Sequence, residues 1–475
     1  MVRRRTLAVA SGVTAALLAG SWSAAYALSA HPAPAARATA ASAVQPAGQV
    51  ARTPVTDPTP TRTPTTTPAP RVRQALARNC SISAAARDPR LASFQGRVVD
   101  DASGEVLFDR RGAVASRTAS VLKLLTTAAA LEVLGPDHRF TTTVVKGSKP
   151  GQIVLVGGGD VTLSRTPVGT TTAYAGAPHL ATLVAQVKKA WAADPANRGQ
   201  RITQIVLDSS YFGGPSWQPT WHDQDRIDGY MPRITALMVD GDRDVPSAPV
   251  SYRGLDPVGR AGAAFAAYFG PGVTTVRGTA PAHAARLGLV RSQPVSTLVQ
   301  QTLIVSDNTI AEALARETAI VSGAGDRFTD EQQGTVTGLQ GYGIDTSALR
   351  IVDGSGLSDD NAVPPTYLTR LLHLVRLRVG SLGAIYDGLP VSGRTGSLSY
   401  SDRFQGAAAR ADGAVHAKTG WIDTGYTLAG VIHAKDGTPL VFAFYALGHV
   451  TESTKAALDE LTADAWACGS HLSNR

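Results

Sequence analysis

Cysteine, methionine and lysine are scarce in this chain of 475 residues. It has two cysteines, three methionines and eight lysines, against 37 arginines. Two lone cysteines and scattered histidines provide no cluster of metal ligands, so we expect neither a metal nor a cofactor. No segment repeats at a fixed period, as a repeat protein would require.

Positive charge is lacking from most of the chain, although the formal net charge is +8. Residues 1–79 hold nine arginines, one aspartate and no other charged residue, which leaves a net charge of zero for residues 80–475. A protein that binds nucleic acid needs a basic surface, so this class of function is excluded. Hydrophobic residues make up 43% of the chain, enough for a core in two or three domains.

The first 72 residues are predicted to lie outside the folded domains. Arg3, Arg4 and Arg5 precede an uncharged run over 7–27 that closes on the small-residue pattern Ala25-Tyr26-Ala27. This order is typical of a secretory signal peptide, and the chain is expected to be exported. The run is also long enough to remain as a single membrane anchor. Residues 28–72 are rich in Ala, Pro and Thr and are predicted to form a disordered linker.

The two cysteines, Cys80 and Cys468, lie at the two ends of the remaining sequence. In an exported protein a sparse, even count favours a disulfide, here one that joins the ends of the folded region. Two independent buried thiols are the alternative.

The pattern of predicted strands and helices over residues 73–475 indicates an α+β protein interrupted by an insertion. Strands and helices are segregated along the chain instead of alternating regularly. The insertion is placed at 141–285 and is expected to be an α/β domain, which leaves 73–140 and 286–475 as the main domain. Strands are predicted at 97–100, 104–109, 142–145, 153–156, 202–207, 414–421, 427–433 and 440–447, and helices at 120–134, 180–192, 295–320 and 453–467.

Three short motifs occur in order in the main domain: Ser120-Val-Leu-Lys123, Ser306-Asp307-Asn308 and Lys418-Thr419-Gly420. Each alone is weak, because a Ser-x-x-Lys pattern arises easily by chance. The ordered set uses two of only eight lysines and is far more specific.

The first motif suits a serine nucleophile with a lysine base. Residues i and i+3 share one helix face, so the Lys123 amine is expected to reach the Ser120 hydroxyl and take its proton. Burial, the positive helix end and a second cation at Lys418 are each expected to lower the pKa of Lys123. Thr118 or Ser116 is expected to cap the helix.

The other two motifs suit substrate binding. Ser306 is placed to relay a proton, and Asn308 offers an amide to a substrate peptide. Lys418 and Thr419, on a strand at the sheet edge, supply a cation and a hydroxyl for a carboxylate. An edge strand also accepts an extended peptide by β-augmentation.

With these motifs the chain resembles the serine D-alanyl-D-alanine carboxypeptidases/endopeptidases, the low-molecular-mass class C penicillin-binding proteins. The likeness covers nearly all of residues 80–475. It extends to Gly157-Gly-Gly-Asp160-Val-Thr-Leu, Asp208-Ser-Ser-Tyr-Phe212, Asp353-Gly-Ser-Gly-Leu-Ser358 and His416-Ala-Lys-Thr-Gly420. The resemblance implies a β-lactamase-like transpeptidase domain with an insertion between its first two motifs, acting on peptidoglycan stem peptides and acylated by penicillins.

The resemblance also implies roles for individual residues. Ser120 is the acylated nucleophile and Lys123 its base, while the N–H groups of Ser120 and Trp421 form the oxyanion hole. Ser355 lies close to the site. Asp225 and Tyr230 reach in from the insertion toward the amine end of the stem-peptide side chain. The site is completed by Ser306, Asn308, Lys418, Thr419 and Gly420.

Two positions depart from the family pattern. Trp421 replaces the hydroxyl residue that commonly follows Lys-Thr-Gly, and Asp359 stands where some relatives carry an arginine. Both changes bear on substrate specificity.

Two other functions stay open. A class A β-lactamase needs a deacylating glutamate in a Glu-x-x-Leu-Asn context, and Glu331-Gln-Gln does not provide one. A non-catalytic envelope protein that binds peptidoglycan is the second alternative. The intact Ser120, Lys123, Ser306, Asn308 and Lys418 argue against it.

Overall fold

A computed structural model describes residues 78–474 of the chain. The predicted signal peptide or anchor and the linker fall outside the described residues. No helix within 78–474 combines the length and the apolar character needed to cross a bilayer.

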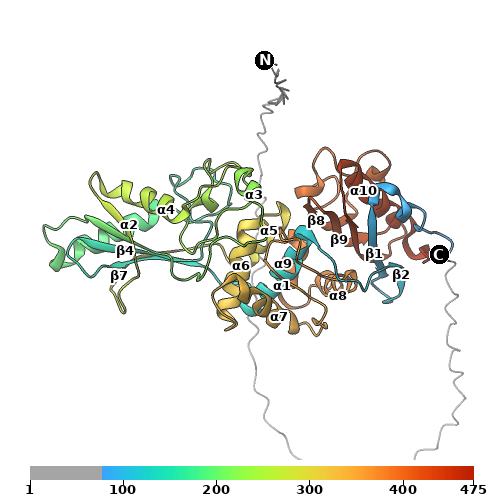
Figure 1. The fold of residues 1–475 in the computed structure, drawn as a ribbon, viewed down its shortest axis with the longest axis horizontal. Helices are drawn as coiled ribbons and strands as arrows, with labels where there is room; N and C mark the ends of the chain where they lie inside the picture. Colours follow the sequence, from blue (N-terminus) through green and yellow to red (C-terminus); the bar gives the residue numbers. More distant parts are fainter. Residues whose placement is uncertain (1–77, 475) are drawn as a thin grey trace, which may run out of the picture. The chain divides into compact units, whose positions relative to one another are not determined.

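The first sheet is formed by the two ends of the described chain. Its five strands lie in the order β2-β1-β10-β9-β8, and every neighbouring pair is antiparallel. This leaves β8, which carries the Lys-Thr-Gly motif, at one edge (Figure 1). The strands are β1 (Ser93–Asp100), β2 (Val106–Arg110), β8 (Val415–Ile422), β9 (Gly425–His433) and β10 (Pro439–Leu447).

Each face of the first sheet packs on helices through its own apolar core. On β9 and β10, Ala429, Val431 and Ala443 face a helical layer, while alternate residues such as Leu428 and Phe442 pack toward the last helix. The helices of the main domain are α1 (Lys123–Val133), α5 (Val295–Ile304), α6 (Asn308–Val321), α7 (Glu331–Gln340), α8 (Pro365–Arg376), α9 (Gly383–Gly388) and α10 (Glu452–Cys468).

The predicted disulfide is present. Cys80 and Cys468 are bonded, with their Cα atoms 5.5 Å apart and 388 positions apart in sequence. Since Cys468 ends α10 and Cys80 precedes β1, the bond joins the two ends of the main domain.

Two predicted helices are broken where the motifs lie. The helix predicted from Ser120 begins instead as a 3-10 turn, η3 (Ala119–Leu122), and α1 starts only at Lys123. Neither predicted cap forms, because the Thr118 hydroxyl donates to the carbonyl of Ala119 and η3 has no side-chain cap. The helix predicted over 295–320 is two helices, since Asp307 caps a new helix by accepting the N–H of Ile310 (2.8 Å).

The second sheet belongs to the insertion and is mixed. Its order is β6-β5-β4-β3-β7, with parallel β4–β5–β6 and antiparallel β3 between β4 and β7. Helices α2 (Leu180–Ala193) and α4 (Pro257–Ala266) pack on it through Leu183, Val187 and Phe265. The strands are β3 (Thr141–Lys146), β4 (Gln152–Gly158), β5 (Gln204–Asp208), β6 (Thr274–Arg277) and β7 (Arg286–Arg291).

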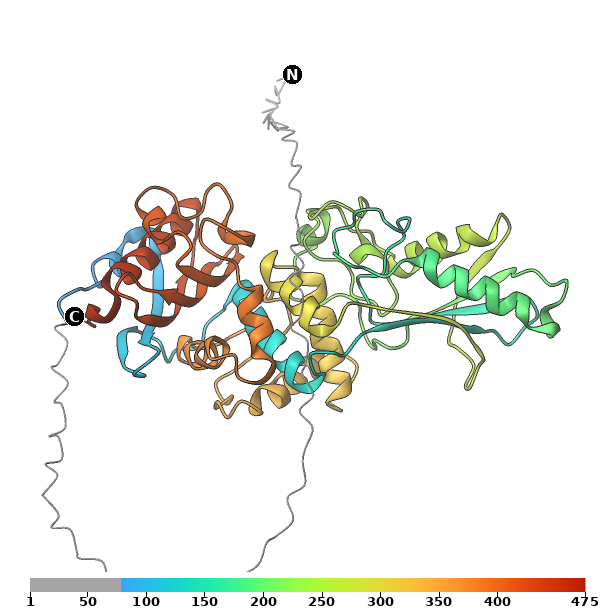
Figure 2. The ribbon, with the colours of Figure 1, turned by 180° about the vertical axis from the view of Figure 1, so that it is seen from behind.

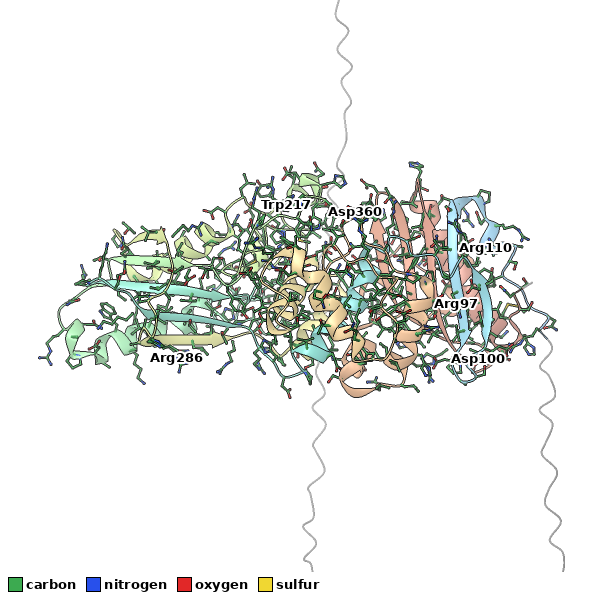
Figure 3. All side chains as sticks on the ribbon, turned by 60° about the horizontal axis from the view of Figure 1, so that its bottom comes forward. Arg97, Asp100, Arg110, Trp217, Arg286 and Asp360 are labelled. Atoms are coloured by element: carbon green, nitrogen blue, oxygen red, sulfur yellow. A yellow bond between two sulfur atoms is a disulfide. The ribbon has the colours of Figure 1, made fainter. Side chains whose placement is uncertain are left out.

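The second sheet extends beyond the boundary predicted at residue 285. β7 pairs with β3, because the chain returns to the main domain alongside the strand by which it left. Figure 3 labels Arg286 on this sheet and Arg97 and Arg110 on the first sheet, with the helical layer between them.

Residues 209–256, between β5 and α4, contain only one short α-helix, α3 (Asp223–Ile227), and no strand longer than an isolated bridge. We call them the inner segment. They lie at the helical layer of the main domain, whereas the second sheet points away from it (Figure 2). Met231, Ile234 and Trp221 of this segment form a small core with Phe328 of the main domain.

Candidate active site

Ser120 and Lys123 meet within the 3-10 turn that precedes α1. Residues i and i+3 of such a turn lie directly above one another, and the Lys123 Nζ is 2.7 Å from the Ser120 Oγ. The predicted contact is therefore present, although the turn that makes it is not the predicted α-helix. Lys123 is fully buried and Ser120 is partly exposed.

The Lys123 amine has three polar partners, and two of them are acceptors only. Besides the Ser120 hydroxyl, Nζ contacts the Asn308 Oδ1 (2.6 Å) and the backbone carbonyl of Ser355 (2.7 Å). A neutral amine has two hydrogens to donate and one lone pair. When it donates to the amide oxygen and to the carbonyl, its lone pair faces the Ser120 hydroxyl, the one partner that carries a proton.

Burial makes the neutral form of the amine accessible near neutral pH. It lowers the pKa of Lys123 to about 8, against the opposing attraction of the Asp353, Glu312 and Asp307 carboxylates. Lys418 was expected to lower the pKa of Lys123, but the structure shows the effect on Lys418 instead. Burial, followed by the charge of Lys123, holds the pKa of Lys418 well below its usual range.

The Ser-Asp-Asn motif forms the turn between α5 and α6. Ser306 has φ of 60°, a left-handed conformation that a serine adopts at a cost and that here interrupts the helical run. Its hydroxyl accepts a hydrogen bond from the Lys418 Nζ (2.8 Å), which also donates to the Thr419 carbonyl (2.6 Å). The second and third motifs are thus in direct contact.

The outer edge of strand β8 is covered at its start, where Val391 bridges His416, but from Thr419 onward no backbone hydrogen bond of the described residues covers it. The N–H of Ala417 points away from β9, because it donates to the carbonyl of Pro390 (2.9 Å). Backbone direction alternates along a strand, so the N–H groups of Thr419 and Trp421 lie on the same outer edge. The Thr419 hydroxyl bonds that of Ser397 (2.7 Å).

Two glycines allow β8 and the 353–358 loop to approach the Ser120 backbone. A Cβ on Gly420 would lie 2.9 Å from the Ser120 nitrogen, and one on Gly356 would lie 2.0 Å from the carbonyl oxygen of Ala119. Gly356 also has φ of 87°, which other residues rarely adopt. Both positions require glycine for Ser120 to face the strand edge.

The inner segment touches the second motif at two points. The Asn308 Nδ2 donates to the backbone carbonyl of Tyr230 (3.3 Å), while the Tyr230 ring is exposed. The Arg243 guanidinium donates to the Asp307 Oδ2 (3.0 Å), and both side chains are buried. Arg243 also lies over the ring of Tyr174 at 4.6 Å. Neither Arg243 nor this pair was predicted from the sequence.

Asp225 lies on α3 of the inner segment, within electrostatic reach of Asp423 in the β8–β9 connection. Burial raises the pKa of its carboxyl, and the carboxylate of Asp423 in that connection raises it further. The carboxyl groups of Asp225 and Asp423 are therefore close enough to interact. The backbone carbonyl of Asp225 accepts the N–H of Tyr230 (2.7 Å), which links the two predicted residues.

The two departures from the family pattern lie at the rim of this edge. The Trp421 ring is half-exposed and packs obliquely on Tyr426 at 6.3 Å. Asp359 accepts a hydrogen bond from Thr424 (2.6 Å) and pairs with Arg117 at 3.5 Å. One oxygen of Asp359 thus binds Thr424 in the β8–β9 connection, and the other binds Arg117, which precedes η3.

The 353–358 loop brings Ser355 to the site by its backbone. Its carbonyl contacts Lys123, and the residue is fully buried. The N–H groups of Gly354 and Ser355 donate to Glu312 of α6, a residue that the sequence analysis missed. The spacing of four between Asn308 and Glu312 could have indicated it, because such residues lie on the same face of a helix.

Comparisons with known proteins bear on this arrangement. Residues 78–254 and 247–466 match the D-Ala-D-Ala carboxypeptidase 3 (S13) family. The chain is 35% identical over 395 residues to the carboxypeptidase DacB of Mycolicibacterium smegmatis, covering 82% of this chain and 84% of that relative. It is 28% identical over 478 residues to a D-alanyl-D-alanine carboxypeptidase of an Actinomadura species, covering 80% and 82%.

Among solved structures, penicillin binding protein 4 from Haemophilus influenzae is similar in fold. The TM-score is 0.66 at 20% sequence identity, and the match covers 79% of this chain and 95% of that one. The expected fold class, a penicillin-binding domain of α+β type, is thereby confirmed.

Proposed function

The chain belongs to the D-Ala-D-Ala carboxypeptidase 3 (S13) family, and from this premise we propose that Ser120 is its acylated nucleophile and Lys123 the base. The protein is a serine-type D-Ala-D-Ala carboxypeptidase and therefore a hydrolase. The observation that carries the assignment is the position of the Lys123 Nζ, 2.7 Å from the Ser120 Oγ and otherwise held by two pure acceptors. Once this amine is neutral, its lone pair faces the Ser120 hydroxyl.

Acylation follows from this geometry. The Ser120 Oγ attacks the carbonyl carbon between the two D-Ala residues while its proton passes to the Lys123 Nζ. The carbon–nitrogen bond then breaks, and the leaving amine receives a proton from Lys123 through the Ser306 hydroxyl. Terminal D-Ala leaves and an ester on Ser120 remains. Water then gives a proton to Lys123, attacks the ester and releases the shortened peptide, and Ser120 recovers its proton.

The strand edge binds the peptide and its charges. The N–H groups of Ser120 and Trp421 receive the negative oxygen that develops on the attacked carbonyl, and Asn308 and the edge of β8 hold the extended peptide. The substrate carboxylate lies at Lys418, Thr419 and Gly420. A carboxylate there favours the charged form of Lys418, which burial otherwise disfavours.

The inner segment receives the far end of the stem-peptide side chain. Asp225 supplies negative charge, with Asp423 beside it, and this suits an ammonium group on the substrate. Tyr230, exposed next to Asn308, forms the wall of that subsite.

The substrate determines where the protein acts. Peptidoglycan stem peptides lie outside the cytoplasm, and the Cys80–Cys468 disulfide suits an oxidising compartment. We assign the catalytic role to residues 73–140 and 292–475, with 141–291 as the insertion because β7 pairs in its sheet, 28–72 as the spacer and 1–27 as the export signal or a single anchor. β-Lactams are covalent inhibitors in this scheme.

The proposal is tested by intact-mass measurement after benzylpenicillin is added. One adduct is expected on the parent and none on Ser120→Ala. Ser322→Ala is the matched control, because Ser322 follows the far end of α6, about 20 Å from Asn308 at 1.5 Å per residue. A parent that forms no adduct would overturn the assignment and favour a non-catalytic binding protein.

Two further measurements distinguish β-lactamase, carboxypeptidase and endopeptidase activity. Rapid loss of the adduct with turnover of benzylpenicillin would identify a β-lactamase instead. Incubation with a pentapeptide and with a cross-linked dimer distinguishes a carboxypeptidase from an endopeptidase, and we expect the pentapeptide to lose its terminal D-Ala.

A further inference from the structure

Both pure acceptors of the Lys123 amine depend on helix α6. Asn308 begins the helix and supplies its Oδ1 directly. The Ser355 carbonyl lies on a loop, and a loop needs a separate support to hold a carbonyl within 2.7 Å of a buried amine. That support lies one helical turn after Asn308.

Glu312 of α6 holds the loop at this carbonyl. Its Oε1 accepts the N–H of Ser355 (2.7 Å) and its Oε2 accepts the N–H of Gly354 (3.2 Å). A residue four positions after Asn308 lies on the same helix face, so one rigid element sets both acceptors.

Asp353 fixes the other side of the same loop. It accepts the N–H groups of Gly356 and Ser358, each at 2.7 Å, and the indole N–H of Trp221 (2.8 Å). The Ser355 carbonyl belongs to the same peptide unit as the Gly356 N–H, which Asp353 holds, and Glu312 holds the N–H groups of the two preceding peptide units. The carbonyl is therefore bracketed by two buried carboxyl groups.

Keeping Glu312 buried has an energetic cost. The side chain is fully buried, and burial, followed by the charge of Asp353, raises its pKa to about 8. Burial of a carboxyl group is unfavourable unless its hydrogen bonds compensate for the lost hydration. Its contacts are to backbone groups of the loop that touches the base.

We propose that Glu312 is a positioning residue for the general base: it holds the Ser355 carbonyl against the Lys123 amine so that the amine lone pair faces Ser120. The inference rests on the proposed roles of Ser120 and Lys123 and adds the element that orients them. Glu312 does not touch substrate and acts through Ser355.

A matched control lies on the neighbouring helix. Glu331 of α7 is also fully buried, and its carboxyl group interacts with that of Glu312 through space. Among the described residues, its side chain makes no hydrogen bond to the loop. Burial holds the pKa of Glu331 well above its usual range, and glutamine keeps nearly the same size and shape without a charge. The titratable groups that face Glu312 are Asp353 on the loop, Lys123 on α1, Glu331 on α7 and Arg316 on α6.

The experiment compares acylation by benzylpenicillin in the parent, Glu312→Gln, Glu312→Ala and Glu331→Gln across pH 6 to 10. The informative quantity is the plateau rate above pH about 9, where an amine of pKa about 8 is mostly neutral. We expect the plateau to fall at least about ten-fold in Glu312→Ala. In Glu312→Gln we expect a smaller fall, because the amide oxygen still accepts the N–H of Ser355. Glu331→Gln should stay within about two-fold of the parent.

Several outcomes would overturn the inference. They are a parent-like plateau in both Glu312 variants, a shift in the pH midpoint with no change in the plateau, and an equal loss in Glu331→Gln. The midpoint shift alone would make the role of Glu312 purely electrostatic. If Glu312→Ala does not fold, the plateau acylation rate of Glu312→Gln is compared with that of the parent instead, and a parent-like rate overturns the inference. A parent that is not acylated at all refutes the proposed function itself, which separates that failure from this one.

Discussion

The insertion consists of two parts that differ in what they support. The outer part, the second sheet with α2 and α4, has its own apolar core. Within residues 141–208 and 257–291, no hydrogen bond of the described structure ends on the three motifs or on the 353–358 loop. The inner segment has almost no regular structure and bonds the second motif and that loop directly.

This difference shows how an insertion supports the proposed site. The outer part supplies rigidity, because its strands pair in register and its helices bury apolar faces. The inner segment uses that support to bring Arg243 to Asp307 and Trp221 to Asp353. Irregular segments on a rigid scaffold commonly carry function. Here the inner segment also holds the catalytic motifs themselves in position.

The largest effect is expected on the main-domain side, at Lys123. Lys123→Met removes the base, and acylation by benzylpenicillin should fall by about 10²- to 10⁴-fold. Stability should change little, because two effects of a few kcal/mol oppose each other. Removing a buried amine relieves its burial, while the Asn308 and Ser355 acceptors lose their donor.

Lys188→Met in α2 is the control in the outer part, where Nζ donates to the carbonyl of Tyr268 and lies over the ring of Phe269 at 5.6 Å. Acylation in this variant should match that of the parent. A large drop in the thermal midpoint of Lys123→Met would instead make Lys123 a structural residue.

Arg243→Gln tests the inner segment directly. It leaves the Asp307 carboxylate buried without its partner, which costs about 3–5 kcal/mol. Because Asp307 also caps α6 between Ser306 and Asn308, acylation of the folded variant should fall at least about ten-fold. Thermal unfolding and acylation rates are measured on the same preparation.

Arg277→Gln in β6 is the matched substitution in the outer part. Arg277 and Asp256 are both well exposed, and such surface pairs contribute about 0–1 kcal/mol. If the Arg277 variant loses as much acylation as the Arg243 variant, the distinction between the two parts of the insertion is wrong.

A smaller effect is expected at Asp225, and only with a charged substrate. Asp225→Asn should raise KM several-fold for a pentapeptide whose third side chain ends in an ammonium group, since one opposite charge is lost. Acylation by benzylpenicillin, which lacks that group, should stay within about two-fold. Asp228→Asn, at the exposed end of the same helix, is the control. Equal KM values for the parent and the Asp225 variant would remove Asp225 from the subsite.

The smallest effect on catalysis is expected from the disulfide. Replacing Cys80 and Cys468 by serine should lower the free energy of unfolding by about 2–5 kcal/mol, because the bond closes a very long loop. Acylation at 25 °C should be unchanged, since neither cysteine lies in the motifs. Urea unfolding of the parent and of the double variant measures the difference, and a reduced acylation rate in the folded variant would contradict it.

Local patterns predicted the elements and motifs better than the contacts between distant segments. The Ser120–Lys123 contact follows from a spacing of three, and the β8–β9–β10 strands follow from their apolar composition. The break at Ser306 was missed, because apolar periodicity continues across it and only the Asp307 cap and the left-handed Ser306 reveal two helices.

Glu312 and Arg243 were missed for another reason. Their partners, Ser355 and Asp307, lie 43 and 64 positions away, and no periodic pattern encodes such pairs. The placement of β7 in the second sheet was likewise invisible, because strand pairing depends on the return path of the chain.

The central claim is that a neutral Lys123 takes the proton of Ser120, and the pH dependence of acylation in the unaltered protein tests it most directly. Burial lowers the pKa of Lys123 to about 8, and only the neutral form accepts a proton. The acylation rate constant should therefore rise with pH through a midpoint near 8 and then level off. A rate that is flat from pH 6 to 10, or that keeps rising toward the ordinary lysine pKa of about 10.4, would contradict the account.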